Sequence, residues 1–139
     1  TIASNLLNVS EDLTDEKISR AVNLSGLDEI LADHDQGLNA KINTINNEFS
    51  LGIRKRISLA RAILIDGNFV IFDEPTEGLD IDGANIFYSF LNSCINSEKT
   101  VVVLSHDPAI IKGANTIVDL NHRPSPIIKS GPRSTNNLE

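Results

Sequence analysis

The chain has 139 residues, of which 40% are hydrophobic and 22% charged, and its formal net charge is -7. This is the composition of a globular domain that buries a core, and no apolar run approaches the ~18 residues that span a membrane. The acidic balance argues against broad nucleic-acid binding, which needs a cationic surface. One cysteine, Cys94, allows no internal disulfide, so we expect a reducing environment and a core-packing role for its side chain.

The charge is unevenly distributed along the chain. Residues 1–49 hold nine acidic and three basic residues, whereas residues 50–139 hold ten acidic and nine basic ones. Four of these bases lie in one segment: Arg54, Lys55, Arg56 and Arg61. A run of charges is more often a solvated face than a site, although this one could also balance the acidic first third. We assign no site to it.

Two short helices are predicted in the first third of the chain. One lies between Thr14 and Gly26, because threonine caps the start of a helix and glycine suits its end. A second helix is predicted within residues 27–35, followed by a polar loop over 37–49. His34 lies between two aspartates, and we expect it to be solvated rather than to bind a metal.

The rest of the chain alternates between helices and strands. Ser50 caps a predicted helix over 51–64, in which apolar residues recur at helical spacing. The further predicted elements are strand 68–73, helix 81–98, a strand within 99–107, a short helix from Pro108, strand 115–120 and an edge strand within 126–131. Apolar strands separated by helices predict an α/β fold with a parallel sheet covered on both faces. We expect residues 132–139 to be disordered.

The stretch FVIFDEPTEGLD, residues 69–80, places two acids directly after a short apolar run. The run is rich in aromatic and β-branched residues and stops at Asp73 and Glu74, before a proline. This pattern is typical of a buried strand. The sequence therefore predicts two carboxylates at the edge of a sheet.

Three segments, FSLGIRKRISLARAIL, FVIFDEPTEGLD and VVVLSHD, resemble the nucleotide-binding domain of ABC-type ATPases in their order and spacing. They match the signature loop and its helix, the Walker B strand with the D-loop, and the switch histidine of that family. The resemblance extends over nearly the whole chain. It implies a P-loop NTPase-type parallel sheet with flanking helices.

The first third resembles the helical subdomain of exporter-type ABC transporters, including peptide and type I secretion exporters. The resemblance rests on TIASNLL, DEKISRAVNLSGLDEIL and QGLNAKI. None of the eight glycines is followed by lysine, so the sequence contains no Walker A loop to cradle phosphates. We therefore expect an incomplete ATPase core from the C-terminal part of a larger transporter subunit. Residues 1–64 are then the helical subdomain with the signature loop and helix, and 65–131 the end of the α/β core.

The resemblance implies roles for three residues at the strand ends. Asp73 would bind Mg²⁺, through water, and Glu74 would polarise the water that attacks the γ-phosphate of ATP. His106, which follows the second apolar strand, would contact the γ-phosphate and hold the same water. The implied cofactors are therefore ATP and Mg²⁺.

Further implied roles concern the signature loop and the D-loop. Ser50 and Gly52 would contact the γ-phosphate bound to the opposite subunit, and Asp80 would fix the D-loop across the dimer interface. Leu51 and Ile53 depart from the family pattern, because they stand where a glycine and a glutamine are usual. A side chain at position 51 hinders approach to phosphate, so we expect the site that this loop completes to be weak.

The sequence thus predicts part of the ATP-binding domain of an ABC exporter, which couples MgATP binding and hydrolysis to transport across a membrane. The implied partners are a second nucleotide-binding domain, as a homodimer or heterodimer, and the transmembrane domains of the same transporter, with no nucleic acid. The chain would lie at the cytoplasmic face of the membrane, and alone it would be inactive. The alternatives are a soluble ABC-type ATPase and a non-hydrolytic regulatory module that keeps the fold.

Overall fold

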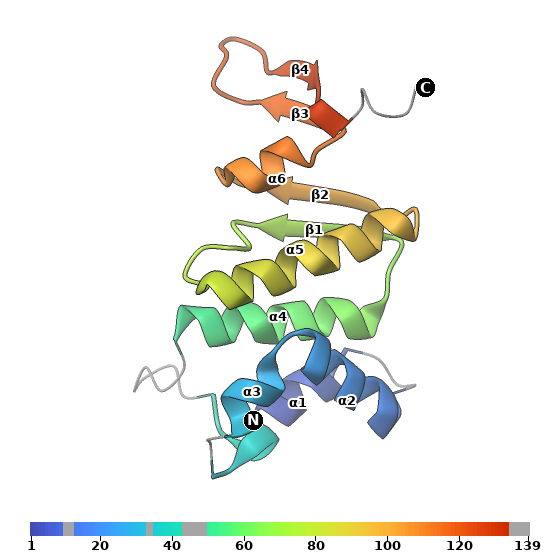
Figure 1. Cartoon of the computed structure of the whole chain (residues 1–139), viewed down its shortest axis with the longest axis vertical. Coiled ribbons are helices and arrows are strands. Elements are labelled where there is room, and N and C mark those ends of the chain that lie inside the picture. The colour runs from blue at the N-terminus through green and yellow to red at the C-terminus, as the bar shows by residue number, and fades with distance from the viewer. Residues whose placement is uncertain (10–12, 33–34, 43–49, 134–139) are drawn as a thin grey trace.

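The computed structural model describes residues 1–9, 13–32, 35–42 and 50–133. The elements in chain order are α1 (Ile2–Leu7), α2 (Asp15–Leu24), α3 (Leu27–Ala32), η1 (Gly37–Asn39), α4 (Leu51–Ile65), β1 (Phe69–Asp73), α5 (Ile81–Asn96), β2 (Thr100–Leu104), α6 (Pro108–Lys112), β3 (Thr116–Asp119) and β4 (Ile127–Ser130). The first three helices lie on one side of α4, and the strands with α5 and α6 lie on the other (Figure 1). None of the helices in the described ranges is long and apolar enough to span a membrane.

The first two helices begin at threonine caps. Ser4 N donates to Thr1 Oγ1 at 3.0 Å, and Lys17 N donates to Thr14 Oγ1 at 3.3 Å. Each bond satisfies an amide that has no partner within its helix. The predicted cap at Thr14 is confirmed, as is the end of α2 before Gly26, which has a φ of 67°. The residue pattern did not predict α1, because its six residues make fewer than two helical turns, which is too short for a clear apolar repeat.

The buried core lies between α4 and the three N-terminal helices. Its members are Ile2, Leu6, Ala21, Val22, Leu27, Leu31, Ala40, Ile57 and Ala60. The apolar stripe predicted on α4 is confirmed, because Ile57 and Ala60 are buried in this core and Ile53, Ile63 and Leu64 pack against it. The polar loop predicted over residues 37–49 contains η1. Residues 43–49 of this loop, and also His34, lie outside the described residues.

The central feature of the second half is a parallel pair of strands. β1 pairs with β2 in the register Phe69↔Thr100 to Asp73↔Leu104. Helix α5 packs on one face of this pair, where the ring of Phe72 meets that of Phe87 edge-on at 5.0 Å. The predicted α/β class with a parallel sheet and flanking helices is confirmed.

Two details of the predicted sheet are wrong. The third predicted strand is β3, and it forms an antiparallel hairpin with β4 rather than joining the parallel sheet. Within the described residues, the parallel pair is also covered on one face only. On the other face the exposed fractions are 60% for Phe69, 58% for Ile71, 42% for Val102 and 47% for Leu104. An apolar strand is suited to burial on both faces, but its composition does not show which other element packs on each face.

Cys94 lies on α5 and is 2% exposed, which confirms its predicted packing role. Burial raises the pKa of its thiol, because the thiolate is less well solvated there than in water. The tail predicted to be disordered comprises residues 132–139, of which 134–139 lie outside the described residues. Of the two described tail residues, Arg133 donates its backbone N–H to Ala114 O at 3.3 Å.

Candidate functional site

The candidate site lies where β1 and β2 end side by side. β1 ends at Asp73, so the prediction that the two acids stand at the end of a strand is confirmed. Glu74 follows with a φ of 41°, and its backbone N–H donates to Leu104 O at 2.9 Å. This bond extends the parallel pairing by one residue. It brings Glu74 beside the residues that follow β2.

The Glu74 carboxylate meets the end of β2 through two side chains. His106 Nε2 lies 3.6 Å from Glu74 Oε1, and Ser105 Oγ lies 3.5 Å from Glu74 Oε2. The His106 side chain is 96% exposed and that of Glu74 35%, so both can reach a molecule in solvent. A carboxylate beside an imidazole can orient a water molecule and accept its proton. The structure therefore brings together the two residues predicted to act in catalysis.

Asp73 provides an exposed carboxylate next to this pair. The described residues contain no group of three or more metal-ligating side chains. Magnesium sites that hold a nucleotide commonly use only one or two carboxylates and take their other oxygens from water and phosphate. The position and chemistry of Asp73 therefore fit the predicted magnesium ligand.

A second polar cluster joins the turn after β1 to the loop after β2. Asp107 Oδ2 accepts hydrogen bonds from Tyr88 Oη at 2.6 Å and from Thr76 Oγ1 at 3.0 Å, and Ala109 N donates to Asp107 Oδ1. Burial acts to raise the pKa of Asp107, but these hydrogen bonds outweigh it and hold the pKa below its usual value. The same bond to Asp107 raises the pKa of Tyr88.

This cluster was not found from the sequence. Its only local signal is Asp107 before Pro108, which is typical of a helix cap. The contacts with Thr76 and Tyr88 come from residues 31 and 19 positions away. The cluster ties Thr76, two residues after Glu74, to Asp107, the residue after His106.

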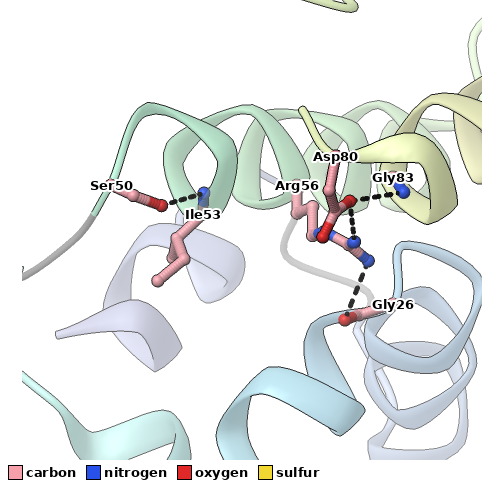
Figure 2. Close-up of polar contacts among 6 residues, drawn as sticks. All are labelled: Gly26, Ser50, Ile53, Arg56, Asp80 and Gly83. Atoms are coloured by element: carbon pink, nitrogen blue, oxygen red, sulfur yellow. Dashed lines mark hydrogen bonds and ion pairs between the residues drawn. The ribbon is translucent and has the colours of Figure 1, made fainter. Parts of the chain in front are cut away.

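The N-terminus of α4 carries the predicted signature residues. Ser50 Oγ accepts from Ile53 N at 3.3 Å, so its predicted role as a cap is confirmed (Figure 2). A Cβ added to Gly52 would lie 2.9 Å from Gly78 O, so the absence of a side chain lets α4 approach this turn. A Cβ on Gly78 would in turn lie 2.6 Å from Leu51 Cδ2. Leu51 therefore covers the turn, while Ile53 packs against the helical core.

Asp80 lies at the centre of a set of polar contacts that link α4, the start of α5 and the turn between α2 and α3 (Figure 2). Its Oδ1 accepts from Gly83 N at 2.7 Å, which caps α5, and from Arg56 Nη2 at 2.9 Å. Arg56 Nη1 also donates to Gly26 O at 3.2 Å. The Gly83 N–H, and then the Arg56 guanidinium, hold the pKa of Asp80 below its usual value.

The interpretation of the basic run as a solvated face is wrong for two of its members. Arg56 is 5% exposed, because the contacts with Gly26 and Asp80 hold it between the helical core and α5. Lys55 is partly buried, and its Nζ donates to Asp73 O at 3.0 Å and to Glu74 O at 2.7 Å. Arg54 and Arg61 are exposed, as the interpretation requires. A burial pattern cannot be read from charge alone, since long basic side chains reach buried carbonyls from the edge of a helix.

Comparison with known proteins connects this geometry to a family. The profile described as "ABC transporter" matches residues 2–77. The ATP-dependent permease MDL1 of Candida albicans is 35% identical over 124 residues, which are 87% of this chain and 18% of the permease. The alpha-hemolysin translocation ATP-binding protein HlyB of Escherichia coli O157:H7 is 29% identical over 122 residues, which are 88% of this chain and 17% of that protein.

A solved structure shows that the fold is shared as well. A bacterial Atm1-family ABC exporter with ATP bound superposes with a TM-score of 0.75 at 21% sequence identity, over 85% of this chain and 20% of that one. This chain therefore spans about a fifth of the length of the proteins that it matches. Because the family profile covers more than half of it, and because the signature helix, the adjacent acids and the histidine occupy one fold, the chain belongs to the ABC transporter family.

Proposed function

We propose that the chain is part of the ATP-binding domain of an ABC exporter, in which binding and hydrolysis of MgATP drive transport across a membrane. The observation that carries this proposal is the 3.6 Å separation of His106 Nε2 and Glu74 Oε1 at the ends of two paired parallel strands. Its partners are a second ATP-binding domain and the transmembrane domains of the same transporter. These partners hold it at the cytoplasmic face of the membrane.

The residues at the strand ends divide the chemistry between them. Glu74 accepts a hydrogen bond from the attacking water and directs its lone pair toward the γ-phosphate. His106 holds that water or the phosphate through Nε2, which already faces the Glu74 carboxylate. Asp73 would hold Mg²⁺, which when bound neutralises charge that develops on the phosphate oxygens.

The N-terminus of α4 serves the nucleotide of the second domain. Its amides and helix dipole favour an anion, and Ser50 and Gly52 stand at this end. Asp80 orders the D-loop at the interface of the two domains, and this role is compatible with its contacts with Arg56 and Gly83. We also propose the division of the chain at residues 64 and 65 into a helical subdomain and the end of the α/β core.

The proposal is tested by replacing Glu74 with glutamine in the full-length protein. The amide keeps the shape of the side chain but cannot accept a proton, so hydrolysis should fall about 100-fold or more while MgATP binding is kept. His106→Ala should also slow hydrolysis. Glu77→Gln, in the same turn and exposed, is the matched control and should leave the rate unchanged. Normal turnover in a well-expressed Glu74→Gln protein would contradict the proposal.

A second candidate function is a non-hydrolytic regulatory module that retains the fold. Two observations favour it: the Leu51 side chain covers Gly78, and the Ile53 side chain packs against the helical core. Leu51 stands where the family has a glycine, and its side chain hinders the approach of a phosphate to the backbone. Ile53 stands where the family has a glutamine, and its side chain offers no hydrogen bond. A full-length protein that binds MgATP without hydrolysing it would support this alternative. Recovery of the full-length protein without any membrane association would instead favour a soluble ABC-type ATPase.

A further inference from the structure

The backbone around Glu74 has a conformation that its own residue type does not favour. Its φ of 41° lies in the left-handed region, where a Cβ crowds the following carbonyl. Such conformations persist only where the surrounding structure holds them. The N–H of Glu74 is held by Leu104 O at 2.9 Å. The carbonyl of Glu74 is held from a different element.

Lys55 provides that contact from the neighbouring helix. Its Nζ donates to Glu74 O at 2.7 Å and to Asp73 O at 3.0 Å, so one ammonium group donates hydrogen bonds to two successive carbonyls. Hydrogen bonds from a charged donor are stronger than neutral ones, and those at a partly buried site are less exposed to competition from water. The two bonds join α4 to the end of β1.

The direction of the Glu74 side chain depends on this backbone geometry. The two carbonyls that Lys55 holds belong to the peptides before and after the Glu74 Cα, so together they orient the N–Cα–C plane and with it the Cα–Cβ bond. Oε1 lies 3.6 Å from His106 Nε2, and a change in the direction of the Cα–Cβ bond would move it away from that position. A contact that orients both peptides therefore restricts where the carboxylate can lie.

We propose that Lys55 is a positioning residue, which fixes the left-handed conformation of Glu74 and thereby places its carboxylate beside His106. Lys55 belongs to the basic run to which the sequence assigns no site, and it acts without touching the substrate. The proposal rests on the proposed function of Glu74. The function of Glu74 then depends directly on the contact by which Lys55 joins α4 to the end of β1.

The test uses the full-length protein with Lys55→Met, which keeps the length of the side chain and removes its charge and its donors. A misplacement of about 1 Å can reduce turnover 100-fold, so we expect kcat for MgATP hydrolysis to fall 10- to 100-fold. The Kd for MgATP should stay within about threefold. Lys55→Arg keeps a charged donor and should recover part of the loss. Arg54→Met removes the same charge from an exposed neighbour and should leave kcat unchanged.

Hydrogen exchange provides a readout that does not depend on activity. Exchange in the peptide that contains residues 73–78 should become faster in Lys55→Met and stay unchanged in Arg54→Met. If Lys55→Met does not fold, Lys55→Gln takes its place in both measurements. Unchanged kcat and exchange would overturn the proposal, as would a loss of MgATP affinity with kcat retained, since Lys55 would then serve the nucleotide directly.

The failure of this proposal can be distinguished from the failure of the proposed function. If Glu74→Gln leaves hydrolysis unchanged, the assignment of Glu74 is wrong, and the exchange experiment alone still decides whether Lys55 holds the turn. If Glu74→Gln abolishes hydrolysis while Lys55→Met has no effect on kcat, the function stands and the positioning role is wrong.

Discussion

The helical half and the strand half of the molecule differ in how they bury apolar side chains. All nine residues of the core cluster lie in α1 to α4 or next to η1. In the strand half, by contrast, one face of the β1–β2 pair exposes Phe69, Ile71, Val102 and Leu104. The helices thus close a core among themselves, whereas the part of the chain that the structure describes covers the strands on the α5 face alone.

This difference shows which interactions organise each half. The helical half is held by apolar packing, which depends on volume and area. The segments that follow the strands are instead held by directed polar contacts: Lys55 donates to Glu74 O, Tyr88 donates to Asp107, and Arg56 donates to Asp80 at the start of α5. Substitutions in the first half should therefore change mainly stability, and those at the strand ends should change mainly geometry. Three stability measurements on the 139-residue chain test this difference between the two halves.

The largest effect is expected for Leu27→Ala in the helical core. Leu27 is 0% exposed, and truncation of such a leucine typically costs about 2–5 kcal/mol because it leaves a cavity. Leu24 lies three residues earlier and is 47% exposed, so Leu24→Ala is the matched control and should cost less than about 1 kcal/mol. Urea denaturation followed by circular dichroism measures both. Equal losses of unfolding free energy in the two variants would show that Leu27 does not lie in a core between α4 and the three N-terminal helices.

A smaller effect is expected for Arg56→Met, which removes the link between the two halves. The Gly26 carbonyl loses a buried hydrogen-bond partner and Asp80 loses its guanidinium. Because the Asp80 side chain is 71% exposed and water can replace the lost partner there, we expect a cost of only about 1–3 kcal/mol. Arg54→Met should change stability by less than about 0.5 kcal/mol. An equally small change in the free energy of unfolding of Arg56→Met and Arg54→Met would mean that the contacts of Arg56 contribute little to stability.

Local signals in the sequence were sufficient for much of the fold. The caps at Thr14 and Ser50 involve bonds across three residues, so residue types at fixed spacing reveal them. The strand that ends at Asp73 follows from a short apolar run, and the apolar stripe of α4 follows from helical periodicity. The adjacent acids and the histidine were recognised by their order along the chain. The structure then brought Glu74 and His106 together.

Contacts between distant residues could not be predicted in this way. Arg56 meets Gly26 across 30 positions and Asp80 across 24, and Lys55 meets Glu74 across 19. Local sequence does not encode which carbonyl an arginine or lysine will reach, since that depends on how separate elements pack. The pairing of β3 with β4 was missed for the same reason, because an apolar strand does not specify its neighbour.

The smallest effect compares two adjacent valines on opposite faces of β2. Val103 pairs in register with Phe72, whose ring packs on α5, whereas Val102 is 42% exposed on the uncovered face. Threonine has nearly the shape of valine and keeps its strand preference, so each substitution mainly introduces a hydroxyl. Val103→Thr should therefore cost about 1 kcal/mol, since burial of a hydroxyl without a partner is unfavourable, and Val102→Thr should stay within about 0.5 kcal/mol.

The same pair of variants also tests whether the second face is uncovered in solution. If copies of the chain associate through this face, Val102 becomes buried, and Val102→Thr will cost as much as Val103→Thr at high protein concentration. The cost should then fall on dilution, because association depends on concentration whereas packing on α5 does not. A difference between the two variants that is independent of concentration is the expected result. It would confirm that α5 covers one face of β1 and β2 and that the opposite face meets water.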